Sequence, residues 1–91
     1  MLIVTHIDIS NADLDLFDEY ESGALQLLER YGARLEDRLR STDARSEIHI
    51  LYFPDGDALE SFRADPVRAA LQDIWHRSGA VSSLLEVKRL A

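Results

Sequence analysis

Two segments of the chain have a residue pattern that repeats at every second position, which is typical of a β-strand. In residues 2–9, LIVTHIDI, this spacing places Ile3 and Ile7 on one face and His6 and Asp8 on the other. Residues 46–53, SEIHILYF, have the same character, and His49 lies between two isoleucines. We predict strands at 2–9 and 46–53, with two further strands at 33–41 and 81–90.

Apolar residues at steps of three and four separate these strands and predict two helical regions. The first covers residues 12–31, ends at Gly32, and carries the stripe Leu14, Phe17, Tyr20, Ala24, Leu28 and Tyr31. Its charged residues, which are Asp18, Glu19, Glu21, Glu29 and Arg30, are expected on a solvated face. The second covers residues 57–78 and is expected to bend or break at Asp65, which precedes a proline suited to the first helical position.

The order of these elements is β-α-β-β-α-β, the pattern of the ferredoxin-like α+β fold. It predicts a single domain, residues 1–91, in which both helical regions cover one face of a four-stranded antiparallel sheet. The other face would have no cover within the chain and would expose apolar residues such as Val4, Leu51 and Phe53. Large exposed apolar patches are uncommon on monomers, so we expect a homodimer.

Composition narrows the classes of partner. Ten basic and 17 acidic residues give a net charge of −7, which argues against binding to nucleic acid or to an anionic membrane surface. There is no cysteine, and no apolar run approaches the length of a membrane span or a signal peptide. The default expectation is a cytoplasmic protein.

Several residues together resemble a known family. A tyrosine in the first helix, Tyr20, is followed by Tyr31, Gly32, Ala33 and Arg34 at the start of the second strand. A strand that ends in Phe53 and Pro54, and a helix with Phe62 shortly before Asp65 and Pro66, complete the pattern. This pattern is similar to that of a widespread bacterial family of uncharacterised small proteins in the dimeric α+β barrel superfamily.

The resemblance implies that the open sheet faces of two protomers pack together, with the helices outside. Members of the superfamily include cofactor-independent monooxygenases that act on polyketide-like aromatics, haem-degrading enzymes, lactone isomerases and ligand-sensing domains. One fold that carries so many chemistries specifies no single activity.

The residues themselves offer one polar cluster with chemical potential. If Ile48 and Ile50 face the helices, His49 faces the barrel interior, and a parallel neighbouring first strand would bring His6 and Asp8 beside it. Arg38 could reach the same face from the second strand.

Three interpretations of this cluster remain open. It could be a hydrogen-bonded network at the dimer interface. It could be a small-molecule pocket in which His6 or His49 is a general base and Arg38 holds an anionic oxygen. It could also be a metal site of two histidines and Asp8, but no spacing in the sequence supports this, so we predict no metal and no cofactor.

Two aromatic residues are further candidates for ligand binding, namely Tyr52 and Trp75. The sequence leaves two classes of function open. One is a cofactor-independent enzyme, monooxygenase-like or isomerase-like, that acts on a small apolar metabolite. The other is a non-catalytic module for ligand binding or dimerisation.

Overall fold

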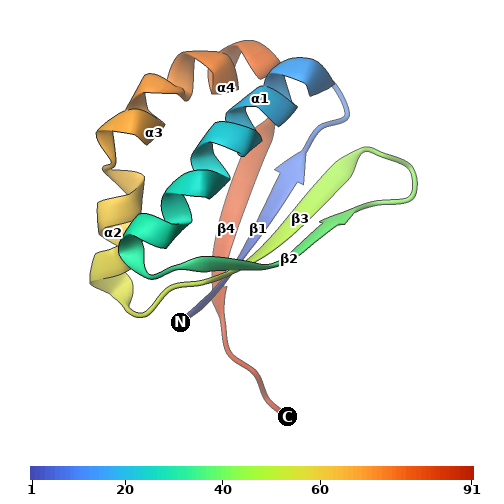
Figure 1. Ribbon diagram of the computed structural model, residues 1–91. Coiled ribbons are helices and arrows are strands. Elements are labelled where there is room, and N and C mark those ends of the chain that lie inside the picture. The colour runs from blue at the N-terminus through green and yellow to red at the C-terminus, as the bar shows by residue number, and fades with distance from the viewer.

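The computed structural model describes residues 1–91 as two layers, a sheet and a set of helices that all cover the same face (Figure 1). The strands are β1 (Leu2–Asp8), β2 (Arg34–Arg40), β3 (Ser46–Tyr52) and β4 (Val81–Val87). They form one antiparallel sheet in the order β2-β3-β1-β4. This confirms the predicted ferredoxin-like α+β architecture.

The expectation of parallel neighbours was wrong, since β1 and β3 pair antiparallel. The crossover through the first helix brings β2 back in the direction of β1, and the hairpin between β2 and β3 then reverses the chain. The central pair of this topology is therefore antiparallel.

The helices begin and end where the sequence supplies caps. The first region consists of α1 (Leu14–Leu25) and a 3₁₀ helix, η1 (Gln26–Tyr31). The Asp13 carboxylate accepts hydrogen bonds from the backbone N–H groups of Asp15 and Leu16, and Gly32 ends η1 at a φ of 67°, which favours glycine. The second region is broken as predicted, into α2 (Gly56–Arg63), α3 (Pro66–Ala70) and α4 (Gln72–Ser78).

The core lies between the helices and one face of the sheet. Ile3 and Ile7 of β1 are buried there, as are Leu51 and Phe53 at the end of β3. The prediction that Leu51 and Phe53 lie on the open face was therefore wrong. Since alternate residues of a strand share a face, Glu47 and His49 lie under the helices as well, and Ile48, Ile50 and Tyr52 lie on the open face.

The open face is apolar across its centre. Val4 of β1 pairs with Ile50 of β3 on one side and with Leu85 of β4 on the other. Leu39 and Leu85 are 52% and 65% exposed. Leu39 reaches this face because a bulge between Leu35 and Asp37 shifts the alternation of β2. None of the helices has the length and apolar character needed to cross a lipid bilayer.

Candidate active site

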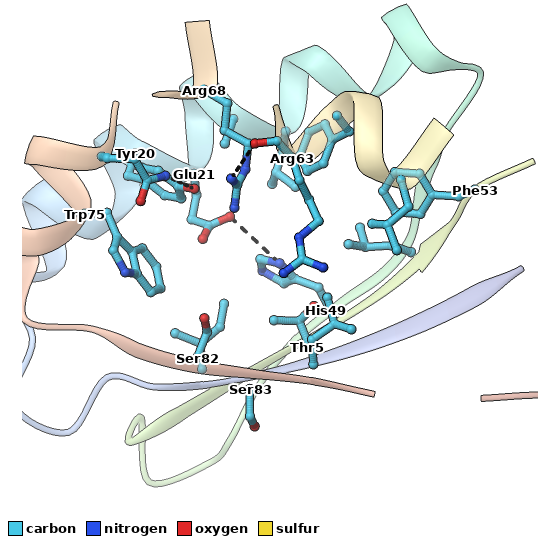
Figure 2. Close-up of a pocket in the computed structure, with 18 residues that line it drawn as sticks. Thr5, Tyr20, Glu21, His49, Phe53, Arg63, Arg68, Trp75, Ser82 and Ser83 are labelled. Atoms are coloured by element: carbon cyan, nitrogen blue, oxygen red, sulfur yellow. Dashed lines mark hydrogen bonds and ion pairs between the residues drawn. The ribbon is translucent and has the colours of Figure 1, made fainter. Parts of the chain in front are cut away.

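A pocket with a volume of about 420 Å³ lies between the sheet and the helices (Figure 2). Its volume falls within the range of roughly 300–1,000 Å³ that is usual for small-molecule sites. The residues that line it are Thr5, Ile7, Tyr20, Glu21, Ala24, Leu25, His49, Leu51, Phe53, Leu59, Phe62, Arg63, Arg68, Gln72, Trp75, Ser82, Ser83 and Leu84.

Aromatic side chains form both ends of this pocket. Figure 2 shows Trp75 and Phe53 at opposite ends, with His49 between them. The ring centroids of Tyr20 and Trp75 are 5.0 Å apart, and those of Phe53 and Phe62 are 5.7 Å apart. Such walls favour a flat, largely apolar ligand.

His49 is the central polar residue of the pocket. It projects from the middle of β3 towards the helices and is 3% exposed. Its Nε2 lies 2.6 Å from Oε2 of Glu47, and its Nδ1 lies 3.8 Å from Oε2 of Glu21. Burial lowers the pKa of His49 below its ordinary value, although its hydrogen bond to Glu47 acts in the opposite direction.

Glu47 is held in the charged state by two arginines of β2. Nε and Nη2 of Arg40 donate to Oε1 of Glu47 at 3.1 and 2.7 Å, and Nε of Arg38 donates to Oε2 at 3.0 Å. Burial alone would raise the pKa of Glu47, but hydrogen bonds from Arg40, His49 and Arg38 outweigh it and lower that pKa. Asp18 of α1 pairs with both arginines, at 3.5 and 3.6 Å, and completes the network.

These charges select one tautomer of His49. An ionised Glu47 can only accept, so a neutral imidazole must donate its Nε2–H to that carboxylate. The lone pair of Nδ1 then remains free on the side of the ring that faces Glu21 and the pocket. The geometry thus presents a fixed imidazole with a bare basic nitrogen.

Glu21 is a buried carboxyl group to which no protein group donates a hydrogen bond. It projects from α1, is 4% exposed, and has Nδ1 of His49 at 3.8 Å. Burial raises the pKa of Glu21 to about 7, and the charge on Glu47 adds to this effect. Near neutral pH, a substantial fraction of this group is a neutral acid that can donate a proton.

The predicted cluster of His6, Asp8 and His49 does not form. His6 and Asp8 lie on the open face, and His49 lies on the helix-covered face. His6 and Asp8 each have a hydrogen-bond partner nearby. His6 Nε2 lies 3.0 Å from Ser46 Oγ, and the Asp8 carboxylate accepts hydrogen bonds from the backbone N–H and the hydroxyl of Ser10. The metal site that needed all three residues is therefore not formed, and no other group of three His, Asp or Glu side chains could hold a metal ion.

The other predicted residues divide between the two faces. Trp75 lines the pocket. Tyr52 lies on the open face, where the Arg34 guanidinium stacks over its ring at 4.1 Å. Arg38 shares a face of the sheet with His49, as expected, because the two residues are paired across β2 and β3. Its guanidinium contacts Glu47 and Asp18 and does not line the pocket.

The sequence interpretation missed both carboxyl groups of the site. Glu21 was expected on a solvated helix face, and the structure shows that this is wrong. It follows Phe17 by four positions and therefore belongs to the buried stripe, which is the signal that could have identified it. Glu47 is two residues from His49, so any assignment that buries one buries the other.

Comparison with solved structures places this fold among known proteins. SnoaB from Streptomyces nogalater, a cofactor-independent oxygenase, is 16% identical, with a TM-score of 0.73 over 97% of this chain and 92% of SnoaB. A putative antibiotic biosynthesis monooxygenase from Nitrosomonas europaea is 12% identical, with a TM-score of 0.69 over 96% and 98% of the two chains. A dimeric ferredoxin-like protein of unknown function from a Jannaschia species is 14% identical, with a TM-score of 0.64 over 96% and 100%.

No protein-family model matches the sequence, and no curated protein matches it. At identities this low, the structural likeness shows the fold alone. The shared fold is the ferredoxin-like α+β fold that the order of elements in the sequence predicted.

Proposed function

We propose that this protein is a cofactor-independent enzyme in which His49 removes a proton from a carbon atom of a small, largely apolar metabolite. The observation that carries the proposal is the state of the His49 ring. Glu47 fixes its Nε2–H, and its Nδ1 faces a pocket of about 420 Å³ with no hydrogen bond. A buried neutral imidazole held in one orientation is suited to general-base catalysis near neutral pH.

The proposed step begins with a substrate whose C–H bond lies next to a carbonyl group. Nδ1 of His49 takes the proton, and the electron pair of the broken C–H bond moves onto the carbonyl oxygen. Glu47 stabilises the imidazolium that forms, as a carboxylate does beside a catalytic histidine. Arg38 and Arg40 keep Glu47 charged for this role.

Glu21 has the role of stabilising the oxyanion that develops on the substrate. In its neutral form it can donate a hydrogen bond to the enolate oxygen, as a protonated carboxylic acid does in an apolar oxyanion hole. The 3.8 Å between Glu21 and Nδ1 allows one substrate to contact both, because a carbonyl oxygen and the adjacent carbon are themselves about 2–3 Å apart.

The carbanion can react with molecular oxygen without a cofactor. Attack of O₂ on a CH₂ carbon gives a hydroperoxide, and loss of one water leaves a carbonyl group, so the substrate supplies all the electrons. The fold shared with SnoaB, which is a cofactor-independent oxygenase, favours this outcome. Return of the proton to a different carbon would instead make the reaction an isomerisation.

Deuterium exchange tests the proton transfer separately from the reaction with oxygen. Polyketide-like aromatic compounds with an acidic CH₂ group are incubated with the protein in D₂O without oxygen, and loss of the CH₂ signal is measured by NMR. The His49→Gln variant should lose this exchange, and the His76→Gln variant, which is altered on the exposed surface of α4, should retain it. Binding without exchange by the unaltered protein would support the non-catalytic alternative.

We further propose that the protein acts as a homodimer joined through its open sheet face. The row formed by Val4, Ile50 and Leu85 is apolar and has no cover within the chain. Burial of such a patch is the main driving force for association. In this arrangement, His6, Asp8 and Tyr52 lie at the interface and each protomer keeps its own pocket.

A further inference from the structure

Arg68 is a charged residue of the pocket to which the proposed proton transfer gives no role. It comes from α3 and is partly buried, and Figure 2 shows its side chain entering the pocket from the helix side. Its guanidinium lies over the Phe62 ring at 5.4 Å, and its Nη1 donates to the backbone oxygen of Arg63 at 3.3 Å.

The Arg68 guanidinium forms no ion pair within 4.0 Å, although the chain carries 17 acidic residues. Glu21 is the one carboxyl group that lines the pocket, and it influences Arg68 only from a longer range. Arg63, the second arginine of the pocket, has a side chain that is 53% exposed and lies 3.8 Å from Glu60. Arg68 is therefore the unpaired cation of the pocket.

A partly buried charge without a counter-ion reduces the stability of a fold. A guanidinium without a carboxylate partner also presents a planar fork, which matches a carboxylate with two parallel hydrogen bonds. The missing partner is thus an anionic group of planar shape that enters the pocket from outside.

We propose that the ligand of this pocket is an aromatic or similarly flat carboxylic acid, whose carboxylate pairs with Arg68 while its apolar body lies between Trp75 and Phe53. This inference rests on the proposed function only in that it places the ligand in the same pocket.

The arrangement also orients the substrate. Arg68 approaches from the helices and His49 from the sheet, so a ligand anchored by its carboxylate would present a more distant carbon to Nδ1. Arg68 is in this sense a binding residue that determines specificity, and it takes no part in the proton transfer.

Two probes of the same shape test the proposal. The dissociation constants of 1-naphthoate and of neutral 1-naphthamide are measured by calorimetry, and quenching of Trp75, the only tryptophan, reports occupancy of the pocket. The unaltered protein should bind the naphthoate at least roughly tenfold more tightly, which is the scale of one charge-assisted contact.

Three variants separate the role of Arg68 from other effects. Arg68→Gln should bind both probes with similar affinity, and Arg68→Lys should show an intermediate preference because it keeps the charge and loses the fork. Arg77→Gln changes the net charge equally on the exposed surface of α4 and should keep the full preference. Circular dichroism establishes that each variant is folded.

The outcomes distinguish this proposal from the proposed function. If His49→Gln keeps the preference for naphthoate while deuterium exchange fails in every protein, the carboxylate site stands and the catalytic role falls. If the unaltered protein binds neither probe, or shows no preference for the acid, the carboxylate site is wrong. The same conclusion holds if Arg68→Gln retains the preference.

Discussion

Glu21 and Glu47 face opposite nitrogens of a single imidazole ring, and their pKa values move in opposite directions. Glu47 accepts from Nε2 of His49 and is held charged by Arg38 and Arg40. Glu21 lies 3.8 Å from Nδ1, receives no hydrogen bond, and has its pKa raised to about 7. Two carboxyl groups in one small site are thereby given different protonation states, which is the arrangement that acid–base catalysis requires.

Replacement of Glu47 by glutamine should destabilise the protein and release the tautomer of His49. The amide leaves Arg38 and Arg40 without their buried counter-charge, so we expect a loss of about 1–3 kcal/mol in the free energy of unfolding, measured with urea. The ¹⁵N shifts of His49 should change from a single Nε2–H form to a mixture. Glu36→Gln removes a carboxylate that pairs with an exposed arginine and should change stability by no more than about 0.5 kcal/mol.

The raised pKa of Glu21 predicts a specific pH dependence of stability. The folded state holds a proton on Glu21 up to about pH 7, whereas the unfolded chain releases it near the ordinary pKa of 4.5. Between these values the folded state binds more protons, so the contribution of Glu21 to stability falls as pH rises. Glu21→Gln should therefore gain stability relative to the unaltered protein as pH rises from about 4 to about 8, by up to about 3 kcal/mol.

Urea unfolding of both proteins across this pH range measures the difference. Glu19→Gln alters an exposed residue of the same helix and should show no such gain. A stability difference between Glu21→Gln and the unaltered protein that stays constant with pH would mean that the Glu21 carboxyl group is not protonated in the fold.

Burial of His49 predicts that its ring titrates below the ordinary pKa of 6.5. The folded state favours the neutral imidazole, so protonation of His49 opposes folding, and the stability that this group contributes rises as pH increases towards 6.5. NMR titration of the ring C–H signals, with His49 assigned by their loss in His49→Gln, measures the midpoint. A midpoint at or above the ordinary value would contradict a buried neutral base.

The sequence predicted the elements of this fold better than the faces of its central strand. Strand and helix positions depend on local periodicity and on caps such as Asp13 and Asp65, which act within a few residues. The orientation of β3 depends on which of its two sets of alternate residues faces the helices. Ile48 and Ile50 are the more hydrophobic pair, yet they lie on the open face.

The physical reason is that both faces of this sheet are apolar. Alternation identifies the buried side only when the other side is polar, and here the open face is itself hydrophobic around Val4 and Ile50. On the covered face of β3, Glu47 is buried beside His49 because Arg38 and Arg40 neutralise its charge. These two arginines belong to another strand, β2, and they follow a bulge that the local sequence pattern did not reveal. The sequence therefore identified His49 and Trp75 as candidate residues, but it placed His49 on the wrong face of the sheet and missed both carboxyl groups.

The open face gives the last prediction, that Ile50→Lys converts a dimer into a folded monomer. Ile50 lies opposite Val4 in the apolar row, so a lysine there would have to lose its hydration when two such faces meet. Light scattering should give twice the chain mass of 10.3 kDa for the unaltered protein and a single chain mass for the variant. Thr42→Lys adds the same charge at the exposed turn between β2 and β3 and should leave the dimer intact. An unaltered protein that is monomeric at micromolar concentration, or an Ile50→Lys variant that still dimerises, would show that the open face is not the interface.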